Sequence, residues 1–285
     1  MRFRPIVTLA VLLLLSCAVQ AQALSSLHRW LTSAEPASRL PLAAATPHTP
    51  AVGAETKTWS VGTEFSYETL SGGLASWYSA QFNLSREFAA GRMVYGSYRE
   101  TSRFSRYDRE ATAGMRQAFG KKWAVQTEAS FSPTHQVLAQ WTFLTQIERQ
   151  FERGWVSQAG FRHSAFNTKR AQLGIVSVER YWSRYRAAYT LYTGAAGNSG
   201  VSMTHRVSGN YFYGARNSLG LGAAWGRELV NLGTRGLLRT NVRAVTLHGR
   251  HWFNARWTAI YGVTWHEQGS LYVRRGLTFG LSRQF

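Results

Sequence analysis

The stretch "WTAIYGVTW" (residues 257–265) decides the fold, because its side chains alternate between two chemical classes. Apolar or aromatic residues occupy every odd position from Trp257 to Trp265, with small or polar residues such as Thr258, Gly262 and Thr264 between them. Successive side chains of a β-strand point to opposite faces of its sheet. The stretch therefore predicts a strand with one apolar face and one small or polar face. Residues 141–147 and 277–285 alternate in the same way.

A motif that recurs about every thirty residues predicts how many such strands there are. An aromatic residue is followed by two or three small or polar residues, and commonly by another aromatic one. The spacings between successive leading aromatics are 31, 32, 30, 32, 40 and 32 residues. Each interval holds two strands of about ten residues with their connections, enough to cross a membrane twice. The leading aromatics are Phe88, Phe119, Phe151, Tyr181, Tyr213 and Phe253, and the last interval ends at Phe285.

The composition favours a membrane barrel over a soluble protein. Aromatic residues make up 14% of the chain and charged residues only 16%, and Pro133 is the one proline after residue 50. A secreted β-sandwich would also alternate, but it would not need aromatic rings at nearly every second turn, where a membrane interface places them. We predict an all-β fold: a transmembrane, antiparallel, up-and-down β-barrel of about 14 strands over residues 57–285 in a Gram-negative cell outer membrane.

The first 56 residues are expected to serve export. Arg2 and Arg4 precede an apolar run at residues 6–16, and the sequence Ala-Gln-Ala at 21–23 suits cleavage, so residues 1–23 are a predicted signal peptide. Alternatively, Cys17 is lipidated. Residues 24–56 are rich in Pro, Ala and Thr and predict a flexible periplasmic linker that could contact a periplasmic partner.

Three further stretches resemble a known family. Residues 103–114 ("RFSRYDREATAG"), 179–192 ("ERYWSRYRAAYTLY") and above all 245–285 are similar to the barrel domain of YaiO-family outer-membrane proteins. The resemblance implies a barrel over residues 57–285 and suggests an association with polysaccharide export, but no defined activity. Phe285 at the end of an alternating strand also resembles the signal read by the barrel-assembly machinery, although Arg283 stands where another aromatic residue is usual.

The polar phase of the strands predicts a charged lumen with two unlike walls. In the first six strands we expect inward acids, with Arg116 as the only base, and from the seventh strand onward inward bases, with Glu228 as the one acid. Such walls would set a transverse field for polar or anionic solutes. Alternatively, these side chains pair and fill a closed interior. The acids are Glu64, Glu68, Glu87, Glu110, Glu128 and Glu148, and the bases are Arg162, Arg170, Arg180, Arg184, Arg186, Arg206, Arg250 and Arg274.

The loops and the remaining motifs argue against a large cap over the mouth and against an enzyme active site. Only the stretch at about 228–240 is long enough to fold over or into the mouth of the barrel. A lipid-modifying enzyme would need a nucleophile beside a base, and the candidates are His163 with Ser164, and His266 and Glu267 with Ser270. Neighbouring strand residues point to opposite faces, so His163 cannot meet Ser164.

A porin-like, non-enzymatic pore is therefore the favoured function, and a non-conducting structural or adaptor barrel is the alternative. We expect no metal and no cofactor, because the histidines lack ligand spacing and no phosphate-binding loop is present. The formal net charge of +19 does not indicate nucleic acid. The arginines are expected to meet outer-membrane lipid and lipopolysaccharide instead.

Overall fold

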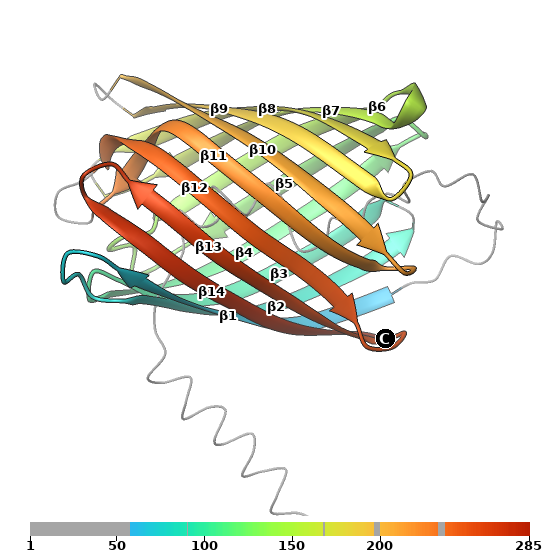
Figure 1. The fold of residues 1–285 in the computed structure, drawn as a ribbon, viewed down its shortest axis with the longest axis horizontal. Coiled ribbons are helices and arrows are strands. Elements are labelled where there is room, and N and C mark those ends of the chain that lie inside the picture. Colours follow the sequence, from blue (N-terminus) through green and yellow to red (C-terminus); the bar gives the residue numbers. More distant parts are fainter. Residues whose placement is uncertain (1–57, 90, 168, 197–199, 233–236) are drawn as a thin grey trace, which may run out of the picture.

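Fourteen antiparallel strands pair in sequence order, and β1 pairs with β14, so the sheet closes into a barrel (Figure 1). This computed structural model describes residues 58–89, 91–167, 169–196, 200–232 and 237–285. It confirms the predicted fold, whereas the predicted signal peptide and linker lie outside the described residues. The strands are β1 (Thr58–Leu70), β2 (Trp77–Ala89), β3 (Arg92–Arg103), β4 (Arg106–Phe119), β5 (Trp123–Phe131), β6 (Trp141–Gln150), β7 (Trp155–Ala165), β8 (Arg170–Trp182), β9 (Tyr185–Ala196), β10 (Val201–Tyr213), β11 (Asn217–Asn231), β12 (Leu237–Trp252), β13 (Trp257–Gln268) and β14 (Tyr272–Gln284).

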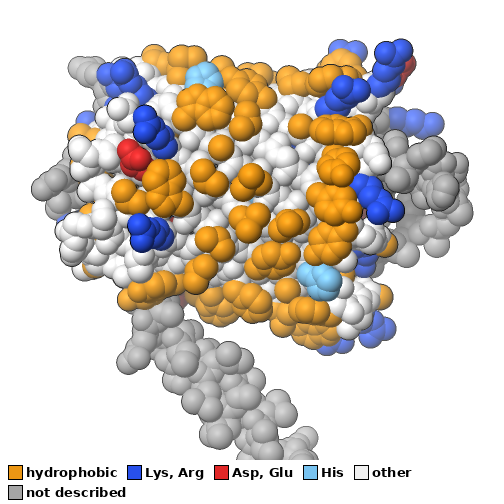
Figure 2. Space-filling view, in the orientation of Figure 1, with side chains coloured by type: hydrophobic (Ala, Val, Ile, Leu, Met, Phe, Trp, Pro, Cys, Tyr) orange, Lys and Arg blue, Asp and Glu red, His pale blue; other side chains and the backbone are white. Residues whose placement is uncertain are grey.

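The apolar phase of the strands faces outward. In β13, Val263 and Trp265 are 50% and 37% exposed, whereas Thr264 and His266 are 4% and 0% exposed. The outward side chains form an apolar band between the two ends of the barrel (Figure 2). Their burial requires a surrounding lipid phase, since no element of the described residues covers them. Among the described residues, no helix is long and apolar enough to cross a membrane.

The two ends of the barrel differ. We call one end the turn end: it carries the short β2–β3, β4–β5, β6–β7, β8–β9, β10–β11 and β12–β13 connections and the C-terminus marked in Figure 1. The recurring aromatic motif lies at these turns, as expected for rings at a membrane interface. We call the opposite end the loop end. It carries the other seven connections, including residues 132–140 between β5 and β6.

Candidate functional site: the lumen and its mouth

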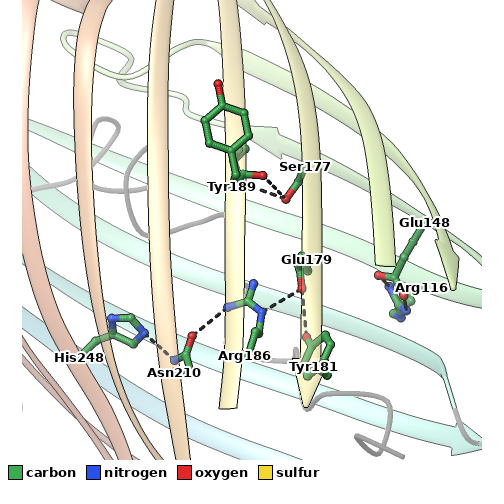
Figure 3. A network of polar contacts seen from close by, with 10 residues as sticks. Arg116, Glu148, Ser177, Glu179, Tyr181, Arg186, Tyr189, Asn210 and His248 are labelled. Carbon is green, nitrogen blue, oxygen red and sulfur yellow. Dashed lines mark hydrogen bonds and ion pairs between the residues drawn. The ribbon is translucent and has the colours of Figure 1, made fainter. Parts of the chain in front are cut away.

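All six predicted acids occupy lumen-facing positions on β1, β2, β4, β5 and β6. Glu68 and Glu110 are nearly fully buried, at 1% and 6% exposure. Glu148 accepts two hydrogen bonds from Arg116, whose Nη1 and Nη2 lie 3.2 and 2.9 Å from its two carboxylate oxygens (Figure 3). This bidentate geometry holds both side chains against the wall.

The prediction that Arg116 is the only base on this wall is wrong. Arg99 and Arg103 of β3 also face the lumen and are each 1% exposed. Arg99 Nη2 donates to Glu110 at 2.8 Å, so this acid is neutralised by its neighbouring strand. In β3 serine, tyrosine and charged residues fall on both phases, and periodicity alone therefore left its orientation ambiguous.

The basic wall is smaller than predicted. Arg162, Arg186, Arg206, Arg250 and Arg274 lie on the lumen-facing phase of their strands, and Arg162, Arg186 and Arg206 are 9%, 7% and 7% exposed. These five arginines come from β7, β9, β10, β12 and β14.

Three of the predicted lumen bases lie elsewhere. Arg170 and Arg180 are on the outer face of β8, and Arg184 is exposed in the β8–β9 turn. Both phases of β8 carry aliphatic residues, with Ile175 buried inside and Val176 55% exposed outside. The strand therefore offers little contrast between its faces, and its phase was assigned the wrong way round.

The same inversion hid an acid. Glu179 of β8 faces the lumen, and its Oε2 accepts hydrogen bonds from Arg186 Nε at 2.9 Å and from the Tyr181 hydroxyl at 3.0 Å. Arg186 Nη1 also donates to Asn210 at 2.9 Å, and Asn210 Nδ2 lies 3.2 Å from His248 Nε2. Figure 3 shows this chain of contacts running across β8, β9, β10 and β12.

The lumen therefore combines local ion pairs with hydroxyl groups, and the predicted transverse field is weaker than an all-acid wall facing an all-base wall would give. Hydroxyls also meet directly across neighbouring strands in several hairpins. The oxygen pairs are Ser66–Ser79 at 3.0 Å, Thr112–Ser130 at 3.0 Å, Thr142–Ser164 at 3.2 Å and Ser177–Thr190 at 3.0 Å.

At the loop end, the β5–β6 connection turns into the barrel. We call residues 132–140 the mouth loop. Asp108 of β4 anchors it: Oδ1 accepts the amide of Gln136 at 2.8 Å, and Oδ2 accepts those of Val137 and Leu138 at 2.7 and 2.8 Å. Val137 and Leu138 are fully buried. The prediction that this connection is too short to enter the mouth is wrong.

The tip of the β11–β12 hairpin also leaves the wall. We call residues 227–232 and 237–242 the mouth hairpin. The stretch predicted as a long loop is mostly paired strand, since β11 and β12 pair with each other up to Asn231 and Leu237. β10 pairs with β11 only as far as Gly226, and β13 pairs with β12 only from Arg243 onward.

The mouth hairpin leans into the lumen from a bend at Gly226. Gly226 has φ of 133°, a conformation that side chains rarely allow, and a Cβ there would clash with the Met203 carbonyl oxygen. Beyond the bend, Leu229 packs with Leu237 against Ala171 and Ala196 on the inner face of β8 and β9. The stretch expected to be long enough to fold over or into the mouth thus enters it, as strand and not as loop.

The two mouth segments meet. Asn231 Nδ2 of the mouth hairpin donates to the Val137 carbonyl of the mouth loop at 2.9 Å. Their strands, β11 and β5, lie nearly half-way round the ring from each other. The contact therefore bridges the loop end of the lumen.

A buried ionic cluster lies beside the bridge. The indole of Trp77 packs between Arg103 and Arg274, whose guanidinium carbons are 4.4 and 4.9 Å from its ring centroid. Arg274 Nη1 donates to Glu68 at 3.0 Å, and both side chains are nearly inaccessible. His266 Nε2 lies 2.7 Å from Gln268 Oε1 and 3.6 Å from Glu228 Oε1. Two cations, two acids and a histidine are thus packed together at the loop end of the lumen.

The residues considered for catalysis are separated. His163 stacks on Trp141 on the outer face with 5.0 Å between ring centroids, whereas Ser164 pairs with Thr142 inside the lumen. His266 is fully buried, but Ser270 is exposed in the β13–β14 loop and Glu267 lies on the outer phase. In the described part of the chain, no group of three His, Cys, Asp or Glu side chains could hold a metal ion.

Comparison with solved structures supports the architecture. The TodX deltaS2S3 mutant monoaromatic hydrocarbon channel matches with a TM-score of 0.51 and 8% identity, covering 81% of this chain and 91% of that one. The CymD monoaromatic hydrocarbon channel matches with a TM-score of 0.50 and 8% identity, covering 81% and 88%. At this identity the likeness concerns the fold alone. A search of curated proteins finds no significant match. A family model described as the YaiO membrane beta barrel domain matches residues 58–229.

Proposed function

Because the chain belongs to the YaiO family of outer-membrane β-barrels, we propose that it is a non-enzymatic channel for small polar, chiefly anionic solutes, with a mouth that opens and closes. The observation that carries this proposal is the lumen face itself. Hydroxyl pairs line it between strands, and arginines from five strands of one half point into it. Such a surface supports passage of hydrated polar molecules and attracts anions.

Arg206 is the arginine that best supports anion preference. It faces the lumen, and among the described carboxylates none forms an ion pair with it, whereas Arg186 is paired with Glu179. A charge that is not neutralised by its neighbours acts on a passing ion over a longer range.

The ion preference of the open barrel is therefore expected to depend on Arg206. Arg206→Gln should shift the reversal potential in a salt gradient toward cations, because a fixed positive charge leaves the lumen. Arg180→Gln is the matched control, because it removes the same charge from β8, two strands away from Arg206, but on the lipid-facing side. Planar-bilayer recordings of both purified variants provide the measurement. Equal shifts, or none in Arg206→Gln, would contradict the anion-channel proposal.

The closed mouth also favours a second candidate, a non-conducting structural or adaptor barrel. The bridge between Asn231 and Val137 and the buried side chains around it support this alternative. Absence of conductance from both the native barrel and variants with a loosened mouth would favour it. In either case, an association with polysaccharide export would act through a periplasmic partner of residues 24–56, and co-purification with and without that segment tests it.

Phe285 fits its proposed part in barrel assembly. Its amide donates to the Trp59 carbonyl at 2.9 Å, which places it where β14 closes on β1, and its ring is 61% exposed. An accessible terminal ring at the closing seam is available to an assembly factor.

A further inference from the structure

Four tryptophan–arginine pairs recur on the outer surface at the turn end. In each, the two residues lie directly opposite each other on neighbouring strands: Trp59 and Arg86, Trp123 and Arg149, Trp155 and Arg180, and Trp257 and Arg283. The guanidinium carbons lie 5.0, 4.9, 5.2 and 5.4 Å from the indole centroids, within cation–π range. Each tryptophan is the first or second residue of its strand, so the four pairs lie at one level of the barrel.

Three of these arginines are held by a second ring. Arg86, Arg149 and Arg283 lie 4.9, 4.8 and 4.6 Å from the ring centroids of Phe88, Phe151 and Phe285, two residues further along the chain. The sequence thus repeats Arg-Glu-Phe once and Arg-Gln-Phe twice, and Arg180-Tyr-Trp follows the same spacing. Rings above and beside a guanidinium restrain its position, but leave its N–H groups able to donate in its own plane.

The four arginines form no ion pair with any acid in the part of the chain that the structure describes, and the nearby Glu87 faces the lumen. The Nε atoms of Arg86 and Arg283 are buried without a hydrogen-bond partner. A positive group that is held in place without a counter-charge from the described residues is suited to bind an anion from outside the chain through its accessible Nη donors.

The surroundings determine which anion this is. The indoles are 36–42% exposed and lie at the edge of the apolar band, at the level of lipid headgroups. Figure 2 shows basic side chains at both edges of this band. The turn end, with its short connections, faces the periplasm. From this we propose that the four pairs are binding sites for the phosphate groups of phospholipids in the periplasmic leaflet. Arginine matches a phosphate with two parallel hydrogen bonds.

The loop end supplies a control of equal charge. Arg170, Arg227, Arg243 and Arg275 are also exposed and outward-facing. Unlike the turn-end arginines, none of them stacks on a ring of the described residues. A general attraction of positive charge for anionic lipid would act on both sets, whereas a built phosphate site exists only at the turn end.

The test measures phosphatidylglycerol that stays bound to the purified, detergent-solubilised barrel by native mass spectrometry. The variant R86Q/R149Q/R180Q/R283Q should retain it roughly tenfold less well than the native protein, whereas R170Q/R227Q/R243Q/R275Q should retain it nearly as well. An equal loss in both variants, or no loss in the first, would overturn the proposal.

Two further measurements keep the result interpretable. If the fourfold turn-end variant does not fold, R149Q/R180Q should lose part of the bound lipid while keeping the strand signal in circular dichroism. An excess of inorganic phosphate should displace little phosphatidylglycerol, because the acyl chains also contact the apolar band. Complete displacement would assign the sites to free anions and refute a lipid site.

Discussion

Asp108→Ala is expected to raise the single-channel conductance of the barrel severalfold. The carboxylate of Asp108 is fully buried and accepts three backbone amides of the mouth loop at 2.7–2.8 Å. Hydrogen bonds to a charged group contribute about 1.5–3 kcal/mol each, so alanine removes three strong contacts that hold this loop inside. The loop then leaves the mouth more often, and the opening widens. Planar-bilayer recordings of the purified barrel measure the change.

Graded variants separate this effect from general damage. Asp108→Asn keeps one acceptor oxygen and should give an intermediate conductance. Thr112→Val is the matched control, because Thr112 lies on the same face of β4 and its hydroxyl pairs with that of Ser130 on the neighbouring wall strand β5, at 3.0 Å. If Asp108→Ala folds but conducts like the native barrel, the mouth loop does not limit the flow.

Glu68→Gln is expected to destabilise the barrel by about 3 kcal/mol, the cost of breaking a buried ion pair. The substitution keeps the shape of the side chain but removes its charge, and leaves Arg274 and Arg103 on either side of Trp77 without that carboxylate. Two like charges in a site shielded from water repel strongly. The midpoint of urea unfolding in lipid vesicles, followed by tryptophan fluorescence, measures the loss.

Two companions test the cause. Glu64→Gln, four residues before Glu68 on the same face of β1 and only half-buried, should cost much less. The double variant Glu68→Gln/Arg274→Met should recover part of the stability, because it removes the cation that lost its partner. A midpoint for Glu68→Gln equal to that for Glu64→Gln would mean that the ionic cluster does not stabilise the closed mouth.

Alternation and repeat length predicted the barrel, because each is a direct consequence of lipid outside and water inside. Trp257, Val263 and Trp265 on one phase of β13, with Thr264 on the other, already define both surfaces. The orientation of β8 could not be predicted in this way, since Ile175 and Val176 give both of its faces an aliphatic character. Periodicity for that reason places Arg170 and Arg180 in the lumen and misses Glu179.

The mouth was harder to predict because its contacts join distant parts of the chain. Asp108 is separated from the amides it binds by a whole strand, and Asn231 reaches Val137 from almost the other side of the ring. One feature of the sequence does point to the buried loop: the apolar run Val137-Leu138-Ala139 is unusual in a connection expected to be exposed to solvent. The burial of all three side chains accounts for it.

The bend at Gly226 determines how costly an opening motion would be. Beyond it, the two strands of the hairpin pair only with each other, and their remaining links to β10, β13 and the mouth loop are side-chain hydrogen bonds. If the hairpin swings toward the cell exterior, no strand pairing of the barrel is lost. The motion would break side-chain contacts, while all fourteen strands stay hydrogen-bonded to their neighbours. Permeability could thus vary while the barrel remains as firmly seated in its bilayer as before.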